Sequence, residues 1–244
     1  MQTGRVIVIT GAAGGMGSLF VDRFLANGDA VVATDIASDA LEVLNPGAGT
    51  KLVTVAGDIS KDADCQRVAD AARDIAGRVD VLVNCAGYFP ITPFEEMTSD
   101  EWRRVVDVNL TGHFLMTRAM LPLMKGRNWG RIINIGSASV FEGVPGQAPY
   151  VAAKAGLVGL SRCLAREFGG YGITVNVMTP GLTVTPPVRD GFPPDMLAKA
   201  RDTRALKRDE QPGDLVGAVF FLASPAADFI TGQIINVDGG NHMH

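Results

Sequence analysis

The chain has 244 residues, of which 47% are hydrophobic and 20% are charged, so it is expected to bury a core and not to be disordered. Its formal net charge of −4 excludes binding to nucleic acid or to an anionic membrane through bulk charge. The cysteines Cys65, Cys85 and Cys163 form no Cys-x-x-Cys pair, and no apolar run suits a signal peptide or a membrane span. We therefore expect a cytoplasmic protein with no metal site and no nucleic-acid or membrane partner.

Short β-branched runs alternate with longer segments of helical periodicity. The expected strands, in chain order, are 5–10, 30–34, 51–56, 79–83, 131–135, 173–178 and 233–237. The expected helices are 15–27, 62–76, 99–124, 147–168 and 212–223. Because strands separated by helices pair in parallel through right-handed crossovers, the pattern predicts an α/β fold. We expect a Rossmann-like, doubly wound parallel sheet of about seven strands with helices on both faces.

One region breaks this alternation. Residues 182–211 contain Pro186, Pro187, Pro193 and Pro194 together with charges of both signs. We interpret this region as a mobile insertion that covers a site. Since no linker or repeat is found, residues 1–244 are expected to form a single domain that both binds a dinucleotide and carries the catalytic residues.

A glycine-rich turn joins the first expected strand to the first expected helix. Its sequence is TGAAGGMG over residues 10–17, with Gly11, Gly15, Met16 and Gly17 as candidate cofactor contacts. Glycines there permit positive φ angles and let main-chain N–H groups approach a pyrophosphate at the N-terminus of a helix. The position between a buried strand and an amphipathic helix is typical of dinucleotide binding, the alternative being a plain turn.

Asp35 ends the second expected strand. A carboxylate there can accept hydrogen bonds from the ribose hydroxyls of adenosine and repels a 2′-phosphate. No basic residue follows it, since the next residues are Ile36 and Ala37. This pattern favours NAD over NADP as the cofactor, with a carboxylate that merely caps the strand as the alternative.

Tyr150 and Lys154 are four residues apart on an expected helix and therefore share a face. A phenol with a pKa of about 10 is a poor base at neutral pH, but a nearby ammonium favours the phenolate, which can exchange a proton with an alcohol or carbonyl oxygen. Ser137 lies at the carboxyl end of the fifth expected strand, the edge at which such sheets bind ligands. Taken alone, Tyr-x-x-x-Lys is most simply a surface pair.

The combination of motifs resembles the short-chain dehydrogenase/reductase family, in its shorter single-domain branch. The matching segments are TGAAGGMG at 10–17, GDIS at 57–60, NCAG at 84–87, VNLTG at 108–112, INIGSAS at 133–139, YVAAK at 150–154, NVMTPG at 176–181 and ITGQIINVDGG at 230–240. These motifs run nearly from end to end. They are specific for fold and reaction type but not for substrate.

The resemblance implies a role for each matching residue. Tyr150 would be the acid/base, Lys154 would lower its pKa and bind the nicotinamide ribose, and Ser137 would orient the substrate oxygen. Asn109 would hold a water that relays protons from Lys154. The further cofactor contacts implied are Asp58 and Ile59 at the adenine, Asn84, Ala86 and Gly87 at the ribose, and Pro180, Gly181, Thr183 and Thr185 around the nicotinamide and phosphates. Cys85, where the family often has asparagine, is expected to be a small buried packing residue.

The expected substrate is a small alcohol or ketone. Ser139 and Gln147 are candidate substrate contacts, and the residues near them, including Tyr88 and Phe89, are mostly apolar. A hydrophobic secondary alcohol, aromatic or alicyclic, suits such a pocket. Within the family the chain is loosely similar to bacterial NAD-dependent secondary-alcohol dehydrogenases. Two other functions stay open: a β-ketoacyl-thioester reductase, which usually uses NADPH, and a regulator that binds NAD without turnover.

The remaining expectations concern assembly and the histidines. Family members are commonly tetramers, so a homotetramer or a homodimer is expected, with the helices 99–124 and 147–168 pairing across twofold axes. His113 is expected to lie on that subunit-packing surface. His242 and His244 are expected to be polar residues of a frayed tail.

Overall fold

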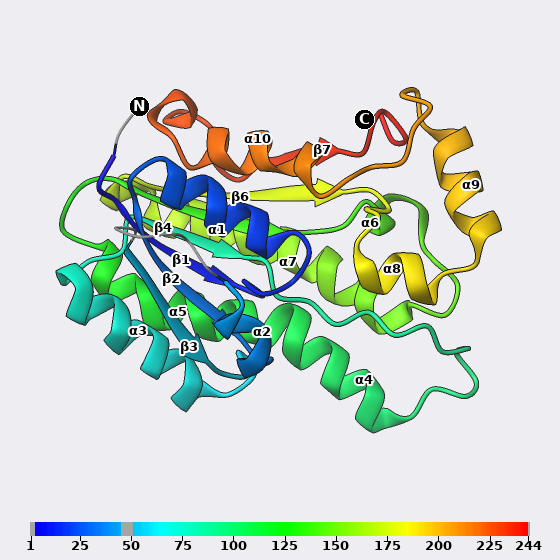
Figure 1. Cartoon of the computed structure of the whole chain (residues 1–244), viewed down its shortest axis with the longest axis horizontal. Coiled ribbons are helices and arrows are strands. Elements are labelled where there is room, and N and C mark those ends of the chain that lie inside the picture. The colour runs from blue at the N-terminus through cyan, green and yellow to red at the C-terminus, as the bar shows by residue number, and fades with distance from the viewer. Residues whose placement is uncertain (1–2, 45–50, 244) are drawn as a thin grey trace.

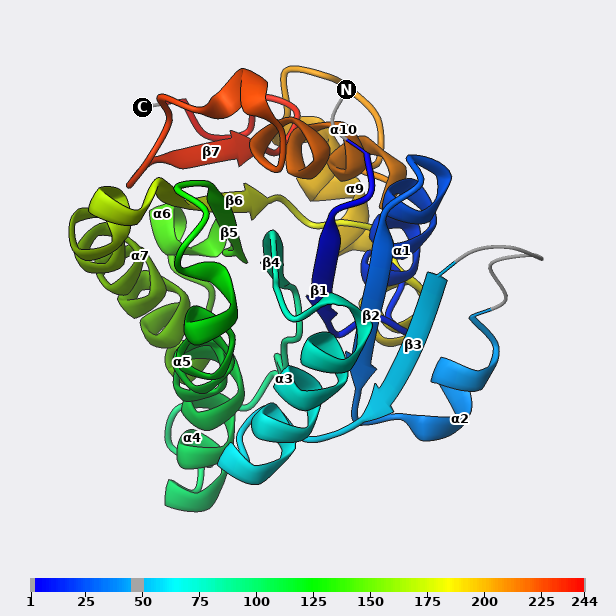
Figure 2. The ribbon, with the colours of Figure 1, turned by 90° about the vertical axis from the view of Figure 1, so that its left-hand side faces the viewer.

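The structure is a computed structural model that describes residues 3–44 and 51–243. Its strands are β1 (Val6–Thr10), β2 (Ala30–Asp35), β3 (Lys51–Ala56), β4 (Val81–Asn84), β5 (Gly130–Ile135), β6 (Ile173–Pro180) and β7 (Ile234–Val237). They form one parallel sheet in the order β3-β2-β1-β4-β5-β6-β7. Helices cover both faces of this sheet, so the predicted fold class is confirmed (Figures 1 and 2).

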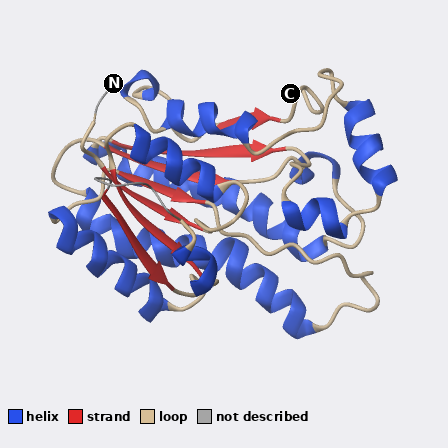
Figure 3. Ribbon diagram, viewed as in Figure 1, coloured by secondary structure: helices blue, strands red, loops and turns tan. Residues whose placement is uncertain are grey.

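The helices lie between the strands along the chain (Figure 3). They are α1 (Gly17–Ala26), α2 (Ser38–Glu42), α3 (Asp62–Ala76), α4 (Ser99–Val106), α5 (Gly112–Met124), α6 (Ser139–Glu142), α7 (Ala148–Phe168), α8 (Pro186–Gly191), α9 (Pro194–Thr203) and α10 (Gly213–Leu222). The helices α2, α6, α8 and α9 were not predicted. The first three have only one or two turns and show little periodicity, and α9 lies in the proline-containing region that was interpreted as an insertion.

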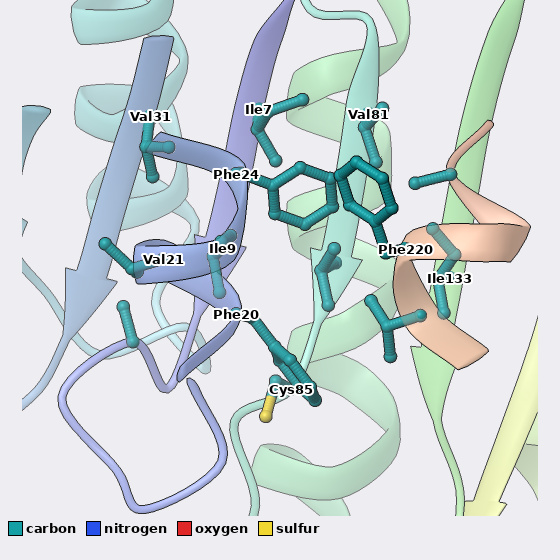
Figure 4. Packing of buried hydrophobic residues seen from close by; sticks show 14 of the residues in the cluster. Ile7, Ile9, Phe20, Val21, Phe24, Val31, Val81, Cys85, Ile133 and Phe220 are labelled. Carbon is teal, nitrogen blue, oxygen red and sulfur yellow. The ribbon is translucent and has the colours of Figure 1, made fainter. Parts of the chain in front are cut away.

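Two apolar cores hold the layers together. On one face, α1 and α10 pack on the sheet, and Phe24 lies against Phe220 with ring centroids 5.5 Å apart (Figure 4). On the other face, α3, α5 and α7 bury a second cluster that includes Val68, Met116 and Phe168. The central strands are buried on both faces, which is why β1 reads as the continuous apolar run VIVIT.

The order of the strands fixes the place of a ligand site. From β1 the chain winds outward through β2 and β3, then returns to pair β4 with the other side of β1. The loops that follow β1 and β4 therefore leave in opposite directions and open a crevice at the carboxyl edge of the sheet. The carboxyl ends of β6 and β7 point to the same end of the molecule, where α6, α8 and α9 lie (Figure 1).

The helix expected over residues 99–124 is interrupted. A π-helical turn, Asp107–Thr111, separates α4 from α5, and the N–H of Gly112 donates to Asp107 O. A one-residue widening of this kind shifts the side chains that follow it and is common at functional sites. Here it carries Asn109, whose Nδ2 donates to Tyr88 O at 2.6 Å.

Residues 182–211, expected to be a mobile insertion, form α8 and α9 and are tied back to the sheet edge. The Thr183 hydroxyl donates to Glu210 Oε1 at 2.6 Å, and Gly181 N donates to Glu210 Oε2 at 3.2 Å. Burial raises the pKa of the Glu210 carboxyl, while the hydrogen bond from Thr183 and the charge of Arg204 oppose that rise. The segment is therefore a pair of helices with fixed ends.

Candidate active site

A cavity of about 690 Å³ opens at the carboxyl edge of the sheet. All the residues predicted for the site line it except Asn84 and Asn109. The predicted residues on its wall are Gly11, Gly15, Met16, Gly17, Asp35, Ile36, Asp58, Ile59, Ala86, Gly87, Ser137, Ser139, Gln147, Tyr150, Lys154, Pro180, Gly181, Thr183 and Thr185. Segments at the carboxyl ends of six strands, β1 to β6, thus meet with the start of α7 around one space.

The glycine turn lies directly against the loop that follows β4. Gly11 has a φ of +64°, and a Cβ added to it would lie 2.7 Å from Ala86 Cα, so no other residue fits. The two loops are joined by Thr10, whose hydroxyl accepts hydrogen bonds from Cys85 N at 3.0 Å and Ala86 N at 3.1 Å. This contact holds bare backbone at the N-terminal end of α1, the geometry that suits a pyrophosphate.

Asp35 is held rigidly at one end of the cavity. Its Oδ2 accepts a hydrogen bond from Ala13 N at 3.0 Å, and its Oδ1 accepts one from Ala37 N at 3.1 Å. A carboxylate has about four lone-pair positions, so each oxygen keeps capacity for another donor. The carboxylate can therefore accept hydrogen bonds from a diol such as a ribose.

Ser137, Tyr150 and Lys154 gather at the other end. Tyr150 lies in the first turn of α7, and its hydroxyl is hydrogen-bonded to the Ser137 side chain. Lys154, one turn further along α7, donates from Nζ to Ile135 O at 2.7 Å. The Phe89 ring lies 6.0 Å from the Tyr150 ring, centroid to centroid. A phenol, a hydroxyl and an ammonium thus border the same apolar space, an arrangement that can hold and protonate a carbonyl oxygen.

The electrostatics of this end differ from the sequence-based expectation. Burial raises the pKa of Tyr150 to about 12, and the hydrogen bond with Ser137 only partly opposes that rise. Burial also lowers the pKa of Lys154 to about 8. Lys154 was expected to lower the pKa of Tyr150, but its Nζ is bonded to Ile135 O and lies 5.7 Å from the centre of the Tyr150 ring. Desolvation by burial is the largest cause of both shifts.

Comparison with known proteins shows what this arrangement resembles. The family described as enoyl-(acyl carrier protein) reductase matches residues 11–242. A 2,3-dihydroxy-2,3-dihydro-p-cumate dehydrogenase of Pseudomonas putida is 39% identical, over 98% of this chain and 95% of that protein. A 3-oxoacyl-[acyl-carrier-protein] reductase of Synechocystis is 37% identical, over 99% of this chain and 98% of that protein.

A solved structure agrees with these sequence matches. The short-chain dehydrogenase/reductase SDR:glucose/ribitol dehydrogenase from Brucella melitensis superimposes with a TM-score of 0.94 at 31% identity, covering 99% of this chain and 98% of the other. The chain belongs to the short-chain dehydrogenase/reductase family. It is an oxidoreductase that acts on CH–OH groups with a nicotinamide cofactor.

One residue predicted from the family motifs does not reach the cavity. Asn84 is fully buried at the end of β4, where its Nδ2 donates to Asn134 Oδ1 at 2.9 Å and to Thr117 Oγ1 at 3.2 Å. Its amide joins β4 to β5 and to α5. Its side chain therefore supports the sheet edge beneath the site, and the cofactor contact expected at Asn84 stays a prediction.

Asn109 is also fully buried, one layer behind the cavity. Its Nδ2 donates to Tyr88 O at 2.6 Å and to Val105 O at 2.9 Å, and its Oδ1 accepts from Tyr88 N at 3.3 Å. A Cβ added to Gly87 would lie 3.2 Å from Asn109 Oδ1 and 4.0 Å from Lys154 Nζ. The absence of a side chain at Gly87 thus leaves space beside both Asn109 Oδ1 and Lys154 Nζ.

The structure also shows where two further residues of the sequence analysis lie, His113 and Cys85. His113, expected on a subunit-packing surface, is fully buried, with Nε2 3.0 Å from Ala86 O. A π-helical turn precedes His113, and a turn of this kind shifts the side chains that follow it. Cys85 is buried in the core beneath the glycine turn, as expected, and burial raises the pKa of its thiol to about 12.

Sequence reasoning missed several polar residues on the cavity wall, namely Arg104, Glu142, Lys199, Thr203, Arg204, Asn241 and His242. They come from helices and a tail that meet only in the folded molecule, so no local pattern marks them. Among the described residues, no group of three or more His, Cys, Asp or Glu is placed to hold a metal ion. No helix among them combines the length and apolarity needed to cross a membrane.

Proposed function

We propose that this enzyme is an NAD-dependent dehydrogenase that interconverts a hydrophobic secondary alcohol and its ketone. The observation that carries the proposal is one continuous cavity with the Asp35 carboxylate at one end and Ser137, Tyr150 and Lys154 at the other. A dinucleotide bound along the glycine turn would span these two ends. The catalytic and cofactor-binding roles given above to the lining residues are part of the same proposal.

The choice of NAD rests on charge at the end of β2. Asp35 would accept hydrogen bonds from the adenosine ribose, whereas a 2′-phosphate would bring like charges together. Ile36, the next residue on the cavity wall, is exposed and apolar, so its side chain has no hydrogen-bond donor or positive charge for a 2′-phosphate. The glycine turn, with no side chain at Gly11, Gly15 and Gly17, leaves the backbone free to approach the pyrophosphate.

The reaction needs a hydride and a proton to move together. The bound nicotinamide supplies the hydride acceptor or donor. Tyr150, whose pKa burial raises, remains a protonated phenol at neutral pH and is competent to give its proton to a ketone oxygen held by Ser137. In the opposite direction the phenolate takes the hydroxyl proton of the alcohol. Since the pKa of Lys154 is about 8, a fraction of its side chains carry a neutral amine at neutral pH, and this amine can then accept the proton.

The walls around Tyr150 favour an apolar substrate. Phe89, Val144, Phe192 and Met196 line the cavity there, beside the polar groups of Ser139 and Gln147. A pocket with a mostly apolar lining and a few polar groups suits a ring-bearing alcohol or ketone. The similarity to a dehydrogenase of a cyclic dihydrodiol supports this class of substrate.

A second candidate is reduction of a β-ketoacyl thioester, which the 37% identity to a 3-oxoacyl-[acyl-carrier-protein] reductase favours. Initial rates with NADH and with NADPH on an acetoacetyl thioester separate the two functions. A strong preference for NADPH on the thioester would replace the proposal by this alternative.

The homotetramer or homodimer expected from the sequence is also part of the proposal. Light scattering of the purified protein measures the mass of the assembly and tests this expectation.

The first test of the proposal is the Tyr150→Phe variant. Because only the proton transfer is removed, we expect kcat to fall by at least about 10²-fold, while the Kd for NAD changes by less than about threefold. A panel of secondary alcohols, followed by absorbance of the reduced cofactor, gives kcat, and calorimetry gives the Kd. Comparable turnover in the wild type and the variant would remove Tyr150 from the proposed role.

A further inference from the structure

The end of the chain forms part of the cavity wall. After β7, the buried carboxylate of Asp238 accepts hydrogen bonds from the backbone N–H groups of Gly240 and Asn241 through Oδ1, and from that of His242 through Oδ2. Asn236 Nδ2 donates to His242 O at 2.9 Å. These bonds hold the segment that was expected to be a frayed tail, and they place the His242 ring on the cavity wall. His244 lies outside the described residues.

The His242 ring is oriented by the same carboxylate. Its Nδ1 lies 2.9 Å from Asp238 Oδ2. Although burial alone would raise the pKa of Asp238, the hydrogen bonds from His242 and its neighbours bring that pKa below the ordinary value, so the carboxylate is ionised and only accepts. In the neutral ring the proton therefore sits on Nδ1, and Nε2 presents a lone pair.

Nε2 faces a second acceptor. The carboxylate oxygen Oε2 of Glu142, at the end of α6, lies 3.5 Å from Nε2 of His242. The Asn241 amide nitrogen lies 3.1 Å from Nδ1 and 3.3 Å from Nε2, so it lies along neither of the diverging lone-pair directions of the ring. When the ring is neutral, a lone pair and a carboxylate therefore lie side by side on the cavity wall, and neither supplies a donor to the other.

This pair of acceptors is close to the proposed reaction centre. Helix α6 starts two residues after Ser137, and the Ser137 hydroxyl accepts a hydrogen bond from Ser139 Oγ at 2.8 Å. Phe141 of the same helix packs against the His242 ring, with centroids 5.8 Å apart. Glu142 ends α6, which begins two residues after Ser137, so the two residues are separated by only about one helical turn and its lead-in.

We propose that His242 and Glu142 form a second polar subsite that accepts a hydrogen bond from a second hydroxyl group of the substrate. This inference rests on the proposed function, because it takes the first hydroxyl to be the one that Tyr150 and Ser137 handle. A hydroxyl can donate to either acceptor without introducing a charge. A substrate carboxylate would meet the charge of Glu142 and is excluded from this position. The enzyme is thus assigned to cyclic diols or hydroxyketones, in preference to simple alcohols.

The experiment compares cyclohexanol with the cis and trans isomers of cyclohexane-1,2-, 1,3- and 1,4-diol, using NAD and the full-length protein. For the wild type we expect at least one diol to exceed cyclohexanol tenfold in kcat/KM. His242→Phe keeps the packing against Phe141 but removes the acceptor, and it should lower that ratio by tenfold or more. His242→Gln, which retains an acceptor, should restore part of it. Met243→Ala, a change of an exposed neighbour in the same segment, is the matched control and should keep the ratio.

A binding measurement separates this inference from the proposed function. In the Tyr150→Phe background loaded with NAD, calorimetry should show the preferred diol binding at least fivefold more tightly than cyclohexanol, and His242→Phe should abolish the difference. If no alcohol is oxidised but this difference in binding is found, the proposed function fails and the subsite stands. An unchanged ratio in His242→Phe overturns the subsite, as does tighter binding of an aminocyclohexanol than of every diol, which would assign the two acceptors to an ammonium group.

Discussion

At the scale of single residues, burial decides what each polar group of the site can do. Tyr150 and Lys154 were predicted to act as a pair in which the ammonium lowers the pKa of the phenol. Instead, burial shifts the two pKa values towards the neutral forms, to about 12 and about 8. Burial thus favours the uncharged form of each group. At neutral pH Tyr150 is therefore a phenol that can donate its proton to a ketone oxygen, and not a phenolate.

Asp35 gives a prediction at the same scale. Because its carboxylate would bind the ribose and repel a 2′-phosphate, Asp35→Ala should reduce the preference for NAD over NADP by about 1–3 kcal/mol. The ratio of kcat/KM for the two cofactors, measured with one alcohol, gives this number. Asp39, an exposed acidic residue of α2, offers a control: Asp39→Ala changes the net charge by the same amount and should leave the ratio unchanged. An equal ratio in the wild type and Asp35→Ala would place cofactor choice elsewhere.

At the scale of the elements, the site depends on how closely neighbouring segments approach. Gly136 follows β5 directly, and its N–H donates to Met178 O of β6 at 2.8 Å. A Cβ added there would lie 2.7 Å from Val177 Cγ1 and 2.9 Å from Thr179 Cγ2. Val177 and Thr179 are both β-branched and have a restricted χ1 angle, so moving them aside costs free energy. The glycine brings Ser137 close to the edge of β6.

Gly136→Ala should therefore destabilise the protein by about 1–3 kcal/mol through overpacking. Urea unfolding followed by circular dichroism measures the change. Gly217→Ala is a matched comparison, because this exposed glycine of α10 has nothing within 4 Å of an added Cβ. That variant should be stabilised by about 0.5–1 kcal/mol, as expected for a helix interior. If Gly136→Ala is as stable as the wild type, β6 can shift to accommodate the added methyl group, and the predicted overpacking is wrong.

At the scale of the whole molecule, polar groups are buried beneath the crevice between the loops after β1 and β4, and their burial lowers the stability of the fold. His113 is the clearest of these. It is fully buried, its Nε2 is bonded to Ala86 O, and its Nδ1 has no partner among the described residues. Burial, together with the charge of Lys154, lowers the pKa of His113 to about 3. The folded protein thus keeps a neutral histidine where the unfolded chain, with a pKa of about 6.5, would bind a proton.

The stability of the whole fold should consequently fall as the pH drops below about 6.5. Unfolding takes up one proton at His113 over this range, which corresponds to a loss of about 2 kcal/mol between pH 6.5 and pH 5. Urea unfolding at pH 7.5 and pH 5 measures the loss. His113→Gln has no such group to titrate and should lose about 2 kcal/mol less than the wild type over the same interval. Identical losses in the two proteins would show that other groups, and not His113, account for the acid sensitivity.

Most of the fold and part of the site could be predicted from the sequence. The alternation of buried strands with amphipathic helices defined the sheet. The glycine turn, Asp35 and Ser137 were predicted as site residues because they lie where expected strands end, and Tyr150 and Lys154 because they share one face of an expected helix. Asn84, His113 and His242 could not be placed in this way. Asn84 lies at such an end but turns towards β5, His113 depends on a π-helical turn, and His242 depends on a hydrogen bond to Asp238.

The sequence by itself determined the order of the elements and the motifs at their ends, because apolar periodicity and glycine placement act over a few residues. The tertiary structure alone decided which polar groups share the cavity and which are withdrawn from water. His242 and Glu142 are 100 residues apart, yet their side chains lie 3.5 Å from each other. Such contacts, and the pKa shifts that burial causes, depend on how distant segments pack, and no local pattern of residues encodes that distance.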